Sequence, residues 1–254
     1  YTPDGNPLIG PMPGSPNAVE GGALVSGIPI ASGRHGGCQL EFGADGSLYV
    51  GTGDAAIGTN PQDRSSLAGK VLRVDASTGG PIPPAASPIF TYGHRNVQGL
   101  ADRGEVSGEL AGMWSVEHGP ARDDEVNRLV AGGNAGWNPV GSGVYDESVP
   151  MTDHGLGNNV FDPAYATGAP TLALSGAEWQ DHPSWGAWRG ALAVTALKDQ
   201  SLRLLFFSAE GRYLGQRIVI DGNHGRLRGI TEGPDGALWL TTSTGDDRII
   251  RFGG

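Results

Sequence analysis

Two short runs of polar residues suggest chemistry, because each places several hydrogen-bonding side chains where an apolar, strand-like segment begins or ends. They are YGHRNVQGL at residues 92–100 and WSVEHGPARDDEVN at residues 114–127. Histidine can exchange a proton near neutral pH, and arginine binds carboxylates through a planar fork of donors. The break at Gly119-Pro120 can expose backbone carbonyls, which are good ligands for calcium. These residue types predict a site for proton transfer, anion binding and a hard cation.

Each run also has a purely structural interpretation. His94 and His118 can be explained as buried, hydrogen-bonded histidines, and the acidic residues Asp123, Asp124 and Glu125 as a solvated turn. For either run taken alone, the structural interpretation is the better one. Only the combination of the two runs with further motifs favours a functional site.

The composition fits a globular protein that is rich in turns. A chain of 254 residues can form one domain with a substantial core, and its 44 glycines follow no collagen-like period. The formal net charge of −10 argues against nucleic acid and an anionic membrane surface, which both require basic residues. One cysteine, Cys38, excludes an internal disulfide, and no apolar run approaches the ~20 residues of a membrane-spanning helix.

Hairpin-like segments recur along the chain. Residues 40–50 alternate apolar and polar side chains around an Asp45-Gly46 turn, and residues 232–240 do the same around Asp235-Gly236. Weaker copies are GELAGMWSVEHGP and WRGALAVTALKD, and a further strand pair is expected around Glu210-Gly211. No segment keeps the apolar spacing of a helix. Repeated hairpins with glycine turns predict an all-β chain and favour a propeller over a sandwich.

The hairpins, the two polar runs, RHGG at residues 34–37 and GRLRGI at residues 225–230 occur in one order. Through them the chain resembles the glucose/sorbosone dehydrogenase family, soluble β-propeller aldose dehydrogenases that use pyrroloquinoline quinone (PQQ) and calcium. The resemblance extends from about Ala23 to Thr244. It implies a six-bladed β-propeller of four-stranded antiparallel blades, formed as a single domain by residues 1–254.

The front of the chain departs from the family pattern, because relatives carry about one or two further blades before Ala23. Residues 1–22 are expected to be irregular, so the propeller is expected to be incomplete. Sheet edges left open in this way favour aggregation. The sequence leaves three explanations open: a fragment, closure by another segment or subunit, or a reduced relative. A cleaved leader before Tyr1 also remains open.

The resemblance assigns catalytic and cofactor-binding roles to individual residues. His35 matches the general base that takes the proton of the anomeric hydroxyl, and Gly36 and Gly37 should let backbone and ring approach closely. Arg95 belongs to the same catalytic centre. The residues that match contacts to the cofactor are Arg95, Asn96, His118, Lys198, Arg226 and Arg228.

Two metal sites follow from the same resemblance. The backbone oxygens of Gly119 and Pro120 match the ligands of the calcium beside the cofactor. Glu125 matches a second, structural calcium site of some relatives, although Ala135 stands where the family usually has an aromatic residue.

The implied function is oxidation of the C1 hydroxyl of aldose sugars to lactones, with hydride transfer to PQQ and a soluble electron acceptor. The implied location is the periplasm or outside the cell. The alternative is a non-catalytic propeller that binds a sugar or a protein partner and retains the site as a relic. A calcium-dependent hydrolase would need more converging carboxylates or asparagines than Asp54, Asn96 and Asp123. The sequence leaves the sugar open, because propeller specificity lies in variable loops.

Overall fold

The computed structural model describes residues 23–30, 32–104, 108, 110–140, 143–157, 159–245 and 247–253. The prediction of an irregular segment at residues 1–22 lies outside the described residues. Within them the chain is all-β, as predicted, and the only helices described are the short 3-10 helices η1 (His154–Leu156) and η2 (Pro183–Trp188). Neither is long and apolar enough to cross a membrane.

The strands form antiparallel sheets, each made of consecutive strands. The first sheet contains β1 (Gln39–Phe42), β2 (Leu48–Gly51), β3 (Lys70–Val74) and β4 (Ile89–Tyr92). The second contains β5 (Val97–Asp102), β6 (Met113–Glu117), β7 (Glu125–Arg128) and β8 (Tyr165–Ala166). The third contains β9 (Leu174–Trp179), β10 (Leu192–Ala196), β11 (Ser201–Phe207) and β12 (Tyr213–Asp221). The last described sheet contains β13 (Leu227–Glu232), β14 (Leu238–Thr242) and β15 (Ile249–Phe252).

The predicted turns connect the predicted strands. The Asp45-Gly46 turn joins β1 to β2, with Phe42 paired to Leu48, and the Asp235-Gly236 turn joins β13 to β14, with Glu232 paired to Leu238. Gly46 and Gly236 adopt φ values of +77° and +79°, which a residue with a Cβ rarely adopts. The sequence pattern therefore identified both hairpins, and the backbone angles give the reason for their glycines.

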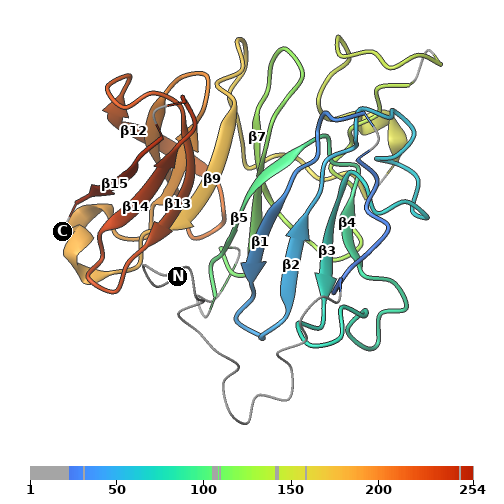
Figure 1. Cartoon of the computed structure of the whole chain (residues 1–254), viewed down its shortest axis with the longest axis horizontal. Coiled ribbons are helices and arrows are strands. Elements are labelled where there is room, and N and C mark those ends of the chain that lie inside the picture. The colour runs from blue at the N-terminus through green and yellow to red at the C-terminus, as the bar shows by residue number, and fades with distance from the viewer. Residues whose placement is uncertain are drawn as a thin grey trace, which may run out of the picture.

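The sheets stand next to one another through their first strands. β1 contacts β5, β5 contacts β9, and β9 contacts β13. Figure 1 shows the sheets side by side, from β1–β4 at one side to β13–β15 at the other. Meandering sheets that meet through their first strands are the arrangement of propeller blades. The number of six blades and the incomplete ring stay predictions.

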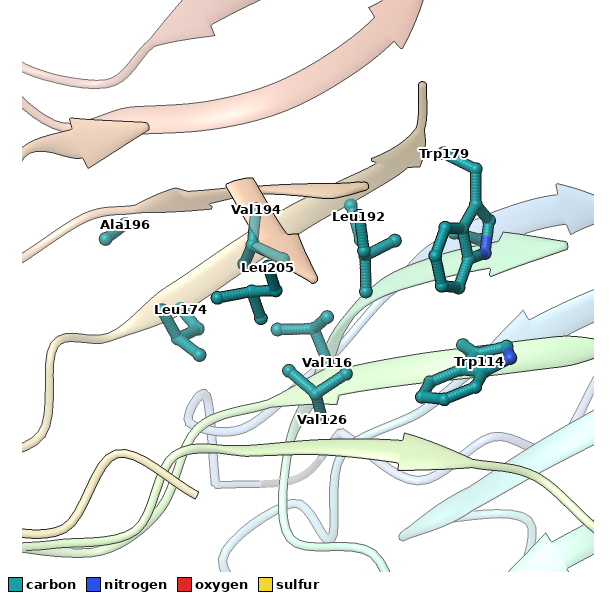
Figure 2. Packing of buried hydrophobic residues seen from close by; sticks show 11 residues of the cluster. Trp114, Val116, Val126, Leu174, Trp179, Leu192, Val194, Ala196 and Leu205 are labelled. Carbon is teal, nitrogen blue, oxygen red and sulfur yellow. The ribbon is translucent and has the colours of Figure 1, made fainter. Parts of the chain in front are cut away.

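The largest apolar cluster lies between the second and third sheets (Figure 2). Trp114 and Val116 of β6 face Leu192 and Val194 of β10, all with less than 2% of their surface exposed. The rings of Trp114 and Trp179 pack edge to face, with centroids 5.4 Å apart. Since burying one large apolar side chain contributes about 1.5–3 kcal/mol, this cluster holds the two sheets at a fixed separation.

The first strands of the sheets, β1, β5, β9 and β13, contact one another and are called the inner strands here. They run in the same direction, so their starts lie at one end of the molecule and their last residues at the other. β1, β5, β9 and β13 follow Gly37, Asn96, Ala173 and Arg226, and all of these but Ala173 belong to the predicted motifs. The opposite ends of these strands carry carboxylates, at Glu41, Asp102, Glu178 and Glu232. The fold therefore brings segments distant in sequence together where the inner strands begin.

Candidate active site

A cavity of about 230 Å³ lies at the start of the inner strands. It is lined by His35, Arg95, Asn96, His118, Gly119, Pro120, Asp124, Thr171 and Ala173. Six of these residues are predicted site residues, contributed by three separate motifs. Larger surface cavities beside Phe90 and Trp188 contain neither a histidine nor a carboxylate.

His35 is held by a buried carboxylate. Its Nδ1 lies 2.8 Å from Oδ1 of Asp54, whose side chain is fully buried, while the His35 side chain is 12% exposed. In neutral imidazole, an Nδ1 that donates to a carboxylate leaves Nε2 as the proton acceptor. This geometry suits a general base at His35.

Asp54 is fixed by two further donors that the sequence motifs did not reveal. The indole nitrogen of Trp137 donates to Asp54 Oδ2 at 2.9 Å, and the Tyr145 hydroxyl donates to the same oxygen at 2.8 Å. Both residues come from the long excursion between β7 and β8. In the sequence, Asp54 is marked only by its position in the TGD that follows β2, and Tyr145 belongs to no motif that indicates a site.

The backbone around His35 depends on glycine at two positions. His35 has a φ of +49°, and its carbonyl oxygen would lie 1.8 Å from a Cβ at Gly53. Gly37 has a φ of +76°, and a Cβ there would lie 2.8 Å from the Gly51 carbonyl oxygen. The predicted close approach is therefore present at Gly37. Gly36 differs, because a Cβ at that position would meet nothing within 4 Å.

Arg95 reaches the cavity from the segment before β5 and is only 5% exposed. Its Nη1 donates to the His118 carbonyl oxygen at 3.1 Å, and its guanidinium lies 5.7 Å from the centre of the Trp137 ring. Its Nε is buried and has no hydrogen-bond partner in the part of the chain that the structure describes. Burying a donor without a partner is costly, so this nitrogen indicates a polar ligand in the cavity.

Asn96 and Gln98 connect the cavity to the last described sheet. Asn96 Oδ1 accepts hydrogen bonds from Gly37 N at 3.3 Å and from Gln98 Nε2 at 3.0 Å. Gln98 Oε1 in turn accepts a hydrogen bond from Arg228 Nη1 at 3.3 Å. Arg228 is thus tied to the site, although its side chain does not line the cavity.

His118 is buried beside the cavity, and its pKa is lowered to about 4. Burial is the main cause, and the positive charges of Arg95 and Arg228 add to it. His118 is therefore neutral at neutral pH. Its Nε2 is buried and finds no hydrogen-bond partner within the described ranges, so His118 can contact a ligand as a neutral imidazole.

The Gly119-Pro120 turn is held by Asp124, which is fully buried. Asp124 Oδ1 accepts a hydrogen bond from Gly119 N at 2.9 Å, and Oδ2 accepts one from Leu172 N at 2.7 Å. A Cβ at Gly119 would lie 2.1 Å from the Arg122 carbonyl oxygen, which explains the glycine. The interpretation of these acidic residues as a solvated turn is wrong for Asp124, because it anchors two segments of the cavity wall.

Lys198 and Arg226 are exposed and lie outside the cavity lining. Lys198 N donates to Leu172 O at 3.0 Å, which places its backbone next to the segment that contributes Thr171 and Ala173. Arg226 and Arg228 are both exposed on either side of the buried Leu227, so they share one face, as the alternation predicted. Their role toward a cofactor stays a prediction.

His94 and Glu125 belong to a buried network behind the cavity. The ring of His94 contacts Thr91 Oγ1 and Glu117 Oε1, both at 2.8 Å, so the structural interpretation holds for His94. Glu117 Oε2 also accepts a hydrogen bond from Arg95 N at 2.9 Å, which fixes the backbone of the first polar run. Glu125 pairs with Glu117 across β6 and β7, and burial raises its pKa to about 8. The solvated-turn interpretation is therefore also wrong for Glu125.

Comparisons with known proteins identify relatives that are described as sugar dehydrogenases. The aldose sugar dehydrogenase YliI of Escherichia coli is 27% identical over 234 residues, which cover 87% of this chain and 61% of YliI. A PQQ-bound aldose sugar dehydrogenase structure from Streptomyces coelicolor is 29% identical with a TM-score of 0.68, covering 85% of this chain and 60% of that one. A Thermus thermophilus structure described as a glucose dehydrogenase is 33% identical with a TM-score of 0.72, covering 90% and 68%.

The chain spans 56% and 61% of the length of two curated relatives that it matches. The family model described as glucose/sorbosone dehydrogenase matches residues 21–251, which is nearly all of the chain described structurally. The resemblance carried by the motifs is thereby confirmed. The chain belongs to the glucose/sorbosone dehydrogenase family.

Proposed function

We propose that this chain acts as a quinoprotein oxidoreductase that oxidises the C1 hydroxyl of aldose sugars to lactones, with PQQ as the hydride acceptor. The observation that carries the proposal is the His35–Asp54 pair in a cavity that Arg95, Asn96 and His118 also line. The names of the relatives support the same activity. A soluble electron acceptor and a location in the periplasm or outside the cell belong to this proposal.

The residues present fit PQQ, which carries three carboxylates and an ortho-quinone. Two buried nitrogens in the cavity wall, Arg95 Nε and His118 Nε2, have no hydrogen-bond partner among the described residues. Arg95 would contact an oxygen of the cofactor, and Asn96 and His118 would line its edge. The exposed cations Lys198, Arg226 and Arg228 would bind its carboxylates, since arginine forms bidentate contacts with such groups.

A calcium ion fits beside the cofactor at the Gly119-Pro120 turn. Both residues line the cavity, and among the described residues neither carbonyl oxygen accepts a hydrogen bond. Such carbonyl oxygens suit calcium. The second calcium site at Glu125 also stays a proposal. In the described part of the chain, no group of three or more His, Cys, Asp or Glu side chains is arranged to hold a metal ion.

When bound, PQQ would supply the electrophilic quinone that accepts a hydride, with calcium polarising it. The chain's own residues would carry out the proton transfer. His35 Nε2 would take the proton of the C1 hydroxyl, and Asp54 would stabilise the resulting imidazolium through the bond at Nδ1. Trp137 and Tyr145 would keep Asp54, and thereby the imidazole ring, in place.

The test is spectral. PQQ and calcium chloride are added to the purified 254-residue chain, and the reduced cofactor is followed after addition of D-glucose and other aldoses. We expect aldose-dependent reduction in the wild type. Tight PQQ binding without reduction by any aldose would instead favour the non-catalytic sugar- or protein-binding propeller.

A further inference from the structure

A carboxylate from the excursion between β7 and β8 lies beside the cavity. Oε1 of Glu147 lies 3.2 Å from Arg34 Nη2, 3.1 Å from Arg95 Nη2 and 4.0 Å from His35 Nε2. One carboxylate thus contacts two guanidinium groups and faces the nitrogen proposed to take the substrate proton. Two arginines and a histidine around one oxygen form a binding position for an anion, and Glu147 fills it.

The protein fixes the loop that carries Glu147. Tyr145, two residues earlier, donates its hydroxyl to Asp54 Oδ2 at 2.8 Å, and its ring centre lies 6.3 Å from that of Trp137. The intervening Asp146 donates its backbone N–H to the Pro139 carbonyl at 2.7 Å. The Glu147 side chain is 41% exposed, so it meets solvent on one side and the basic residues on the other.

The charges decide which sugars this arrangement tolerates. Arg95 is nearly buried, and Glu147 is its acidic partner. A sugar that carries a carboxylate or a phosphate would have to displace Glu147 or lie against it, and like charges that lie side by side repel each other. A neutral aldose carries only hydroxyl groups, which can donate hydrogen bonds to the carboxylate.

We propose that Glu147 is a specificity-determining residue, which occupies the anion position formed by Arg34, Arg95 and His35. Neutral aldoses are thereby admitted, and sugars with a carboxylate or a phosphate are rejected. The inference rests on the proposed function for its substrate class, whereas the binding that it predicts can be measured without turnover.

The test compares the wild type with Glu147→Gln by calorimetry, with D-glucuronate as the probe. Glutamine keeps the size of the side chain and removes its charge. We expect Glu147→Gln to bind glucuronate about tenfold or more tightly than the wild type, since like-charge repulsion is removed and two guanidinium groups become available. The gain should shrink at high salt, as expected for a partly exposed ionic contact.

Two further variants control this comparison. Asp146→Asn removes the same charge from the same loop, but among the described residues the Asp146 carboxylate accepts hydrogen bonds only from Ser148. This variant should therefore bind glucuronate as the wild type does. The double variant Glu147→Gln/Arg34→Gln should lose most of the gain, since Arg34 is part of the anion position.

Equal glucuronate affinity in the wild type and in Glu147→Gln would overturn the proposal. An equal gain in Asp146→Asn would overturn it too, because net charge alone would then explain the effect. Turnover is measured in parallel with glucose and glucuronate. If no aldose reduces PQQ, the proposed function fails, while the calorimetry still decides what Glu147 does to anions.

Discussion

At the scale of single residues, the proposed function assigns proton transfer and cofactor binding to different side chains. His35 is held by Asp54 on one side, and Arg228 is connected to Asn96 through Gln98. A residue that acts on the substrate proton affects the rate, whereas a residue that holds a carboxylate affects cofactor affinity. The two roles can therefore be separated by mutation.

Replacing His35 with alanine should remove most of the turnover and leave PQQ binding nearly unchanged. Loss of a general base typically costs about 10²–10⁴ in rate, and the contacts proposed for the cofactor's carboxylates lie elsewhere. The measurement is kcat at saturating PQQ, together with a PQQ titration. An unchanged kcat in a correctly folded His35→Ala protein would show that His35 is not the general base.

Replacing Arg228 with alanine should weaken PQQ binding first. Arg228 is exposed, so we expect the low end of the range for a charge-assisted hydrogen bond, about 1.5 kcal/mol or roughly tenfold in Kd. A PQQ titration measures the change, and kcat at saturating cofactor should be close to that of the wild type. Exposed Arg212, in the turn between β11 and β12, is the matched control when it is changed to alanine. If both variants bind PQQ equally well, Arg228 does not contact the cofactor.

At the scale of elements, the cavity exists because loops at the start of the inner strands are tied to each other. Asp124 connects the turn after β6 to the segment before β9, and Tyr145 connects the excursion after β7 to Asp54, which follows β2. The sheets thus supply a rigid frame, while single buried side chains set the relative positions of the loops.

Replacing Asp124 with alanine should lower both stability and the order of the Gly119-Pro120 turn. The change leaves the amides of Gly119, Leu172 and Leu174 without their acceptor, which costs on the order of 3 kcal/mol or more. For a chain of this size that corresponds to a fall in Tm of roughly 6 °C or more. Thermal unfolding followed by circular dichroism measures it.

Asp123→Asn is the control for this change, because Asp123 pairs with exposed Arg122 and asparagine tolerates its positive φ of 59°. Its Tm should stay close to that of the wild type. An Asp124→Ala protein as stable as this control would mean that the buried amides find other partners.

At the scale of the whole molecule, the end opposite the cavity gathers acidic groups from neighbouring sheets. Burial raises the pKa of Glu41 on β1 to about 7, with a further contribution from Asp102 on β5. Burial also raises the pKa of Glu178 on β9 to about 7, and the charges of Glu41 and Glu232 add to it. Assembly of the sheets therefore places like charges close together.

This arrangement predicts how these carboxyls change stability with pH. A carboxyl whose pKa is higher in the folded state binds more protons there, so its contribution to folding stability falls as pH rises from about 4.5, the unfolded value, to about 7. Glu178→Gln removes one of these carboxyls and also removes its charge repulsion with Glu41. The fall in stability with rising pH should therefore become shallower. The Tm difference between variant and wild type should be larger at pH 8 than at pH 5.

Glu210→Gln serves as the control, since Glu210 lies on an exposed turn and its pKa is lowered. Glu210→Gln should not make the fall in stability with rising pH shallower. Parallel curves of Tm against pH for Glu178→Gln and the wild type would contradict the prediction and mean that Glu178 does not gain a proton on folding.

The sequence by itself determined the all-β class, the hairpins at Asp45-Gly46 and Asp235-Gly236, and the family. It also identified His35, Arg95 and His118 as cavity residues. These features are local: alternation marks a strand, a glycine turn marks a hairpin, and a rare motif marks a site. Each depends on residues that lie within a few positions of one another.

Only the tertiary structure decided which side chains complete the site. Asp54, Tyr145 and Glu147 are brought to His35 from loops that lie up to about 110 residues away in the sequence. Lys198, Arg226 and Arg228 stay outside the cavity lining. Such contacts depend on how the sheets stack and on where each loop returns. The alternation along a strand sets which face a residue occupies, but it does not show which other segment of the chain packs against that face. For the same reason, Asp124 and Glu125 look like a solvated turn in the sequence and are buried in the fold.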